Sequence, residues 1–333
     1  MKHKSFFLIA ALAATLALHA QQISVVAPGG ATKIFTDLNL AIQGADAGST
    51  IYLSGGGFQV NDTTKIKKKL TIMGIGHRPN NDNVDGNTNV SGNFWFEGGS
   101  DNSSVMGLYL SGNVNIGTTE NAVSNFLLRY CNVNSVQVGN SNCQGIKINQ
   151  NYIRNVSHSG DSPINFTNNI LHSLRNINGG VINNNIIRHN IYHHYSDCAG
   201  CPGIYCNHVL LCVNSTQIKN NIFCDPSGGC VTNECIVSNN VYPGAWGDNC
   251  VTPEDWDSVF MGVDNGVNPS SDFRLKPGKW KTGATDGGEI GIYGGTGFSD
   301  TALPPGPRIV KKHIADQTDE NGNLRVQIEV KVQ

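Results

Sequence analysis

An asparagine recurs along the middle of the sequence at intervals of 16–20 residues, with one interval of 36 that corresponds to two repeats. An apolar residue follows the asparagine each time. The eight positions are Asn93, Asn113, Asn132, Asn151, Asn169, Asn185, Asn221 and Asn240. A repeat this short cannot bury its own apolar side chains, so it must stack on its neighbours. The sequence therefore predicts a solenoid.

The residues around the asparagines indicate which kind of solenoid forms. The runs are short and rich in β-branched residues, as in Val-Ile-Asn-Asn-Asn-Ile-Ile at 181–187, and such runs favour strands. Glycine and asparagine between the runs supply the left-handed backbone that tight corners need. No helical period is sustained, so leucine-rich repeats are a poor match. We predict an all-β parallel β-helix in which residues 51–295 form roughly twelve coils, each about 4.8 Å from the next.

The asparagines have a structural role in such a coil. Side-chain amides that are stacked at one corner can donate and accept hydrogen bonds along the rod and can also satisfy the backbone of the turn. Amides neither titrate nor attack a substrate, so we interpret the asparagine column as structural rather than catalytic.

The two ends of the chain differ from the repeat. Residues 1–20 combine a basic start, an apolar stretch and small residues near Ala20, as in a secretory signal peptide. Residues 35–42 are predicted to form a short helix with a Thr or Asp cap, which would cover the open end of the rod. Residues 21–300 form the expected β-helix domain, and 301–333 an extension with strands at 308–314 and 324–332, which caps the rod or forms an appendix.

Composition restricts the partners. After removal of Lys2 and Lys4 with the signal peptide, 21 basic side chains stand against 25 acidic ones, and nucleic-acid binding would require a basic face. No segment after the signal peptide is apolar enough to cross a membrane. We expect a secreted monomer, periplasmic or extracellular, whose amide- and hydroxyl-rich surface suits sugar hydroxyls, although such a surface is also typical of a plain β-helix.

All ten cysteines follow the expected signal peptide, and an even count in a secreted chain indicates disulfides. Cys206 and Cys224 are 18 residues apart, as are Cys212 and Cys230, so each pair should lie on adjacent coils within bridging distance. The alternatives are unpaired buried thiols and a metal site. The candidate metal ligands are His193, His194, Cys198, Cys201 and Cys206.

Several segments resemble the pectin-lyase-like superfamily, and more closely the secreted β-helix proteins of the Bacteroidetes type. They are the opening segment 35–53, the strand Leu-Thr-Ile-Met-Gly-Ile-Gly at 70–76, and the closing segments 272–278 and 287–295. Residues 279–282, Lys-Trp-Lys-Thr, depart from the small apolar stretch that is usual in that family. The resemblance implies a single-stranded right-handed parallel β-helix, and in some members it implies cleavage of acidic polysaccharides by β-elimination or hydrolysis.

One polar column could carry such chemistry. Arg154, His172 and Arg188 each lie three residues after an asparagine of the repeat and should project from one side of adjacent coils. Two guanidiniums could bind a uronate carboxylate, and the imidazole could act as a base. Alternatively, the column is an exposed surface on which polar residues are tolerated. Sugar-stacking aromatics are a further option, with four candidates: Trp95, Trp246, Trp256 and Trp280.

The sequence leaves catalysis open. Hydrolysis needs paired carboxylates, and no cluster of aspartates resembles the polygalacturonase set, nor does any motif match the calcium-dependent pectate lyases. We expect no dedicated metal site, although calcium could assist an elimination. Three hypotheses follow: a polysaccharide lyase that acts on an acidic glycan, a non-catalytic carbohydrate-binding or adhesion module, and a structural surface protein without a cleft.

Overall fold

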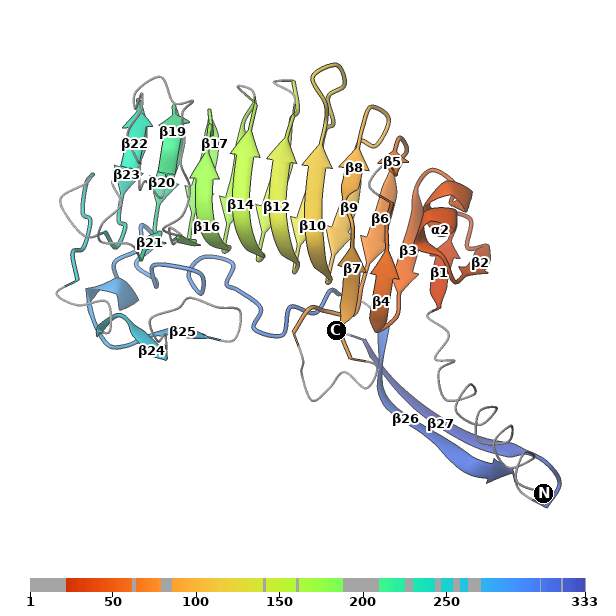
Figure 1. The fold of residues 1–333 in the computed structure, drawn as a ribbon. Coiled ribbons are helices and arrows are strands. Elements are labelled where there is room, and N and C mark those ends of the chain that lie inside the picture. Colours follow the sequence, from red (N-terminus) through yellow and green to blue (C-terminus); the bar gives the residue numbers. More distant parts are fainter. Residues whose placement is uncertain are drawn as a thin grey trace, which may run out of the picture.

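The chain winds into a parallel β-solenoid, seen side-on in Figure 1. The computed structural model describes residues 22–61, 64–78, 86–139, 142–159, 162–187, 210–224, 230–242, 247–253, 258–262, 271–305, 307–318 and 320–332. The solenoid has about seven full turns, to which strands at its ends add partial ones. The expectation of twelve was wrong because residues 271–305 do not continue the coil.

Two sheets form most of the coil wall. The first sheet consists, in spatial order, of β2 (Thr32–Phe35), β1 (Ile23–Val26), β3 (Ser49–Leu53), β6 (Leu70–Met73), β9 (Ser104–Met106), β11 (Leu127–Arg129), β13 (Ile146–Asn149), β15 (Ile164–Thr167), β17 (Gly180–Asn183), β20 (Gln217–Lys219) and β23 (Ile236–Ser238). From β3 to β23 the neighbours are parallel, whereas β1 pairs antiparallel with both β2 and β3.

The second sheet carries the longer strands. Its main path is β21 (Ile222–Phe223), β18 (Ile186–Ile187), β16 (Ile170–Arg175), β14 (Tyr152–His158), β12 (Asn132–Val138), β10 (Tyr109–Ile116), β7 (Thr88–Ser91) and β4 (Gly56–Gln59). Four further strands pair with it: β5 (Lys65–Ile66), β8 (Phe94–Phe96), β19 (Leu210–Asn214) and β22 (Cys230–Asn233).

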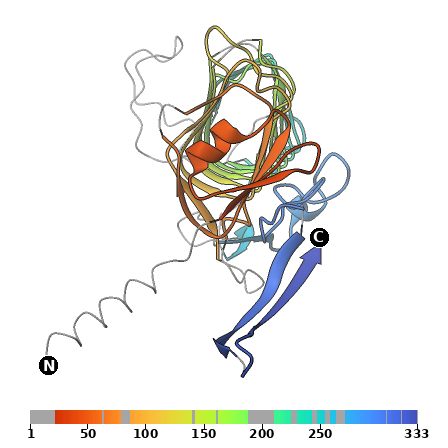
Figure 2. The same ribbon diagram turned by 90° about the vertical axis from the view of Figure 1, so that its right-hand side faces the viewer.

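Helix α2 (Leu38–Gly44) lies across the N-terminal end of the coil, as the view along the rod in Figure 2 shows. The side chain of Asp37 accepts a hydrogen bond from the backbone N–H of Leu40 at 2.9 Å, which is the expected N-cap interaction. Ala41 and Ile42 are buried in the same core as the first strands. The helix therefore shields the apolar interior of the first coil from water.

The interior is a stack of apolar side chains in register. In the first sheet Ile148 pairs with Phe166, Phe166 with Ile182, and Ile182 with Ile218, and all four are fully buried. Each stands three residues before an asparagine of the repeat. Burying such side chains removes apolar surface from water, which is worth roughly 1.5–3 kcal/mol for each of them.

Five of the repeated asparagines form a continuous ladder inside one corner. They are Asn151, Asn169, Asn185, Asn221 and Asn240, all fully buried. The backbone N–H of each of the first four donates to Oδ1 of the next at 2.8–2.9 Å, and their Nδ2 atoms donate to the same oxygens at 3.0–3.1 Å. Each Nδ2 also donates to a carbonyl of the preceding coil at 2.7–3.0 Å. The buried amides are thus paired with one another and with the backbone.

The ladder continues into a cysteine rather than into the earlier asparagines. The backbone N–H of Cys131 donates to Asn151 Oδ1 at 2.9 Å, so Cys131 occupies the ladder position of its coil. Asn132 begins strand β12 and pairs in register with Tyr152 instead. Asn93 and Asn113 lie at a different corner, where Asn93 Oδ1 accepts from the backbone N–H of Asn113 at 2.8 Å. These three asparagines are therefore outside the ladder.

The chain then runs back along the outside of the coil. Residues 283–304, which we call the return segment, pass from the C-terminal coils toward the N-terminal ones beneath the strands in Figure 1. Contacts with the coil follow in reverse order, from Asn239 with Gly283 to Gln150 with Ser299. Near its end the segment packs so closely that a Cβ on Gly107 would lie 2.0 Å from Cγ of Pro304.

The return segment covers the apolar residues that follow the ladder asparagines. These residues form a second core outside the coil: Tyr152, Ile170, Ile186, Ile222 and Val241. Ile290, Ile292 and Phe298 of the return segment belong to the same cluster. Strands β24 (Phe260–Gly262) and β25 (Asp272–Leu275) form a small antiparallel pair beside it, and residues Lys279–Lys281 form a short 3-10 helix. The closing coil expected at 272–278 is absent because these residues pack on the outside.

A hairpin of β26 (Pro307–Thr318) and β27 (Leu324–Val332) ends the chain. It projects from the rod near the N-terminal coils (Figures 1 and 2). Of the two alternatives, this is an appendix and not a cap on the far end. Within the described residues, no helix is long and apolar enough to span a membrane. The expected signal peptide lies outside the described residues.

Candidate functional site

A row of six polar side chains crosses the outer face of the second sheet, one from each of six consecutive strands. Gln59 aligns with Ser91, and Ser91 with Ser111, as the pairing of neighbouring residues requires. The row continues across a bulge in β10 to Asn134, then to Arg154 and His172. All are exposed except His172, which is half-buried. Strand spacing places successive members about 4.8 Å apart along the rod.

The predicted column is the C-terminal part of this row. Arg154 lies between residues that pair with Leu171 and Ser173, which places it beside His172 on the neighbouring strand. Arg188, the third member, lies outside the described residues. Strands β14 and β16 therefore bring together a guanidinium and an imidazole on one open face, as the spacing of the sequence predicted.

His172 has a specific partner that the sequence did not suggest. Its Nε2 lies 2.6 Å from the hydroxyl oxygen of Tyr152, and the two rings meet edge-on with their centroids 5.3 Å apart. Tyr152 is only 5 % exposed, because its ring belongs to the outer core under the return segment. A fixed phenol of this kind holds the imidazole in one orientation next to Arg154.

The N-terminal part of the row lines a groove with a volume of about 600 Å³. Strands β4, β7 and β10 form its floor, and residues 36–39 form one wall. Gln59, Ser91 and Ser111 of the row contribute to it, together with Asn89 and Tyr109. The groove and the Arg154–His172 pair are therefore parts of one polar face.

A second depression, of about 420 Å³, is lined by several lysines but has a structural explanation. Lys65 and Lys67 lie 2.8 and 3.5 Å from the carboxylate of Glu97, and the hydrogen bond from Lys65 is the main cause that lowers the pKa of Glu97. Lys68 donates to two backbone carbonyls near the end of helix α2, at 2.6 and 2.9 Å. These cations thus brace the first coils.

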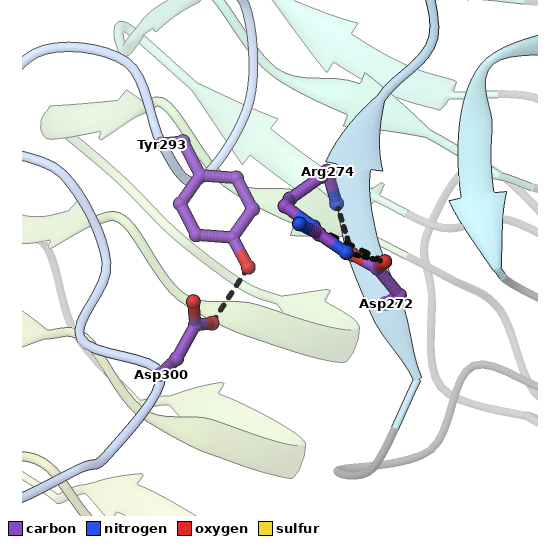
Figure 3. A network of polar contacts seen from close by, with 4 residues as sticks. All are labelled: Asp272, Arg274, Tyr293 and Asp300. Carbon is purple, nitrogen blue, oxygen red and sulfur yellow. Dashed lines mark hydrogen bonds and ion pairs between the residues drawn. The ribbon is translucent and has the colours of Figure 1, made fainter.

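A network of charged residues lies where the return segment meets strand β25 (Figure 3). The Tyr293 hydroxyl donates to Asp300 Oδ1 at 2.6 Å, and Arg274 Nε donates to Asp272 at 2.8 Å. The hydrogen bond from Arg274 lowers the pKa of Asp272 to about 2, and burial is the main cause that raises the pKa of Tyr293. Arg78 donates to the carbonyl of Asp300 at 3.3 Å. Because cations and carboxylates are matched, the network fastens the return segment to the coil.

The tryptophans do not form an exposed platform in the described part of the chain. Trp280 is 8 % exposed, and its Nε1 donates to the carbonyl of Lys276 at 2.7 Å, so it packs in the outer core. Trp95 is half-buried on strand β8. Trp246 and Trp256 lie outside the described residues. The exposed aromatic ring on the polar face is instead Tyr109, which is 38 % exposed.

Metal and disulfide chemistry gain no support within the described ranges. No group of three or more His, Cys, Asp or Glu side chains there could hold a metal ion, calcium included. The cluster from His193 to Cys206 lies outside these ranges, so the pair Cys206–Cys224 is not described either. The structure shows no disulfide among the residues that it describes. In the backbone register, Cys230 lies opposite Leu210 rather than Cys212, because a bulge shifts β19 against β22.

Sequence reasoning missed the role of the residue before each ladder asparagine. Gln150, Asn168, Asn184, Asn220 and Asn239 all have a positive φ of 54–57°. Their side chains point outward and bind the return segment, as in the two hydrogen bonds of 2.8 Å from Asn168 to the carbonyls of Ile292 and Gly294. The Asn-Asn doublets in the sequence were the available signal.

No protein-family model matches the chain, and no curated protein matches it either.

Proposed function

We propose that this protein binds an extended acidic polysaccharide on the outer face of the second sheet. The observation that carries this proposal is the straight row of exposed amide and hydroxyl side chains that leads to Arg154 and His172. Consecutive members are separated by one strand spacing, about 4.8 Å, which is close to the advance of a linear glycan per sugar residue. A guanidinium can hold a uronate carboxylate through two parallel hydrogen bonds.

The setting of this function follows from the sequence. The N-terminal segment has the composition of a secretory signal peptide, so the proposed location is outside the cytoplasm, in the periplasm or the medium. A parallel β-solenoid is also consistent with the resemblance to right-handed β-helices of the pectin-lyase-like superfamily. That superfamily relationship, the right hand of the coil and a monomeric state are parts of the proposal.

A second candidate function is β-elimination, which the Tyr152–His172 hydrogen bond favours. His172 would remove the proton at C5 of a uronate, the C4–O bond would break as the C4–C5 double bond forms, and the departing oxygen would receive a proton. Arg154 would neutralise the carboxylate next to C5. Hydrolysis is less well supported, because none of the six side chains in the row is a carboxylate and hydrolysis needs a pair.

The test of binding is isothermal titration of the purified protein with a panel of acidic and neutral polysaccharides. We expect affinity for an acidic glycan that falls about tenfold in Arg154→Ala, since a charge-assisted hydrogen bond is worth about 1.5 kcal/mol or more. Gln137→Ala is the matched control, because Gln137 is exposed on strand β12 but lies outside the row. Equal affinity in both variants, or no acidic ligand at all, would refute the proposal.

The test of elimination follows absorbance of the unsaturated uronate, with and without calcium. A lyase would produce this absorbance on the glycan that binds, and the signal would be lost in His172→Ala and reduced in Tyr152→Phe. Binding without absorbance would leave a non-catalytic carbohydrate-binding module. Reducing ends without absorbance would indicate hydrolysis.

A further inference from the structure

The groove at the N-terminal end of the polar face differs in charge from the Arg154–His172 pair. Of the described residues that line it, Asp37 alone is charged, and the others are apolar, hydroxyl or amide residues. The nearest strands to Arg154 are two spacings away from the groove residue Ser111, which is about 10 Å. A uronate in the groove would therefore meet a carboxylate without a cation, and like charges at short range repel.

The polar wall of the groove is held in place before any ligand arrives. Asn39 is 9 % exposed, and its Oδ1 accepts from the backbone N–H of Asn61 at 2.9 Å and from the hydroxyl of Thr64 at 2.7 Å. Its Nδ2 donates to the carbonyl of Gln59 at 3.3 Å. Helix α2 is thereby tied to the strand that presents Gln59. Binding to such a wall requires little ordering of the protein, which favours affinity.

An aromatic ring stands in the floor of the groove. Tyr109 begins strand β10, pairs in register with Asn89 on one side and Asn132 on the other, and is 38 % exposed. A ring flanked by amides offers an apolar face for the C–H surface of a sugar ring and hydrogen-bond partners for its hydroxyls. The same arrangement has little to offer an anion.

We propose that this groove is a binding site for uncharged sugar residues, distinct in specificity from the acidic site at Arg154. Tyr109 stacks on a sugar ring, while Gln59, Asn89 and Ser91 bind its hydroxyls. Asp37 accepts hydrogen bonds from hydroxyls and excludes uronates by its charge. Because the groove and Arg154 share one row, a single glycan that contains both neutral and acidic residues can occupy both.

The experiment is titration of the full chain with a panel of neutral polysaccharides, including xylan-, glucan-, mannan- and galactan-type chains. We expect at least one to bind, with affinity lowered about tenfold in Tyr109→Ala and retained in Tyr109→Phe. Tyr52→Ala is the matched control, since Tyr52 is 39 % exposed on strand β3 of the other sheet. Thermal unfolding of each variant establishes that the fold is intact.

Two further variants separate this inference from the proposed function. Arg154→Ala should leave neutral binding unchanged, and Asp37→Asn should let the groove accept acidic oligosaccharides more tightly, because asparagine keeps the helix cap but removes the charge. If no neutral glycan binds, or if neutral binding survives Tyr109→Ala, the inference is wrong. Acidic binding that still depends on Arg154 would then leave the proposed function standing, whereas loss of both classes would overturn both.

Discussion

Asn168 and Asn169 are adjacent in the sequence, and their side chains act on opposite sides of the coil wall. Asn168 Nδ2 donates outward to the carbonyls of Ile292 and Gly294, at 2.8 Å each. Asn169 Nδ2 donates inward to the carbonyl of Ile148 at 2.8 Å. The positive φ of Asn168, 54°, turns the chain so that both are possible. The doublet therefore fixes the return segment and the ladder at the same corner.

The ladder should make a large contribution to stability. In Asn185→Ala, the carbonyl of Phe166 and the backbone N–H of Asn169 lose buried partners, so we expect the free energy of unfolding to fall by about 3 kcal/mol or more. Denaturant unfolding measures this change. The control is Gln217→Ala on the exposed side of strand β20, for which less than about 0.5 kcal/mol is expected. Similar losses in both variants would mean that the ladder carries no special weight.

The outward asparagines should hold the return segment. Asn168→Gly keeps the left-handed backbone but removes the clamp, so amide exchange and protease cleavage within residues 283–304 should increase. Asn168→Ala should show the same increase and a further loss of about 1 kcal/mol, because a Cβ at positive φ is strained. If the glycine variant protects the segment as well as the wild type does, the segment is held by apolar packing alone.

Cys131 should be chemically silent in the folded protein. It is fully buried at the ladder position, and burial raises the pKa of its thiol to about 12, so almost no thiolate exists at pH 8. Alkylation followed by mass spectrometry should label it only after unfolding. In addition, Cys131→Asn should be tolerated, since the Cys131 sulfur already lies 3.2 Å from the carbonyl of Arg129, as an amide nitrogen of the ladder would. Rapid native labelling would contradict the buried position.

Stability should decrease in mild acid because of His77. Burial, with a smaller contribution from Arg78, lowers the pKa of His77 from 6.5 to about 3. The unfolded chain therefore binds a proton that the folded chain does not, so this part of the stability is complete above pH 6.5 and is lost as the pH falls toward 3. At pH 5 the loss should be about 2 kcal/mol. Unfolding of His77→Leu at pH 7 and pH 5 should show a weaker pH dependence, and an unchanged dependence would assign it to other groups.

The sequence predicted the solenoid because its determinants are local. The spacing of the asparagines, the β-branched runs and the cap at Asp37 each report a conformation that nearby residues impose. It also placed Arg154 and His172 side by side, since three residues after equivalent asparagines is the same position in each coil. Asn93, Asn113 and Asn132 show the limit of that reasoning, because an identical residue at a similar spacing lies at another corner once a bulge shifts the register.

The number of turns and the second half of the site depended on contacts between residues far apart in the chain. Residues 283–304 have strand-like composition, yet the apolar stripe from Tyr152 to Val241 needed covering, and this segment covers it instead of forming another coil. Likewise, the Tyr152–His172 contact and the groove around Tyr109 join residues that no local pattern links. The sequence by itself determined the coil, the ladder and the polar column, since these repeat with a fixed period. Only the tertiary structure decided what covers the coil and where the groove lies, because both depend on which nonadjacent surfaces bury the most apolar area while pairing their polar groups.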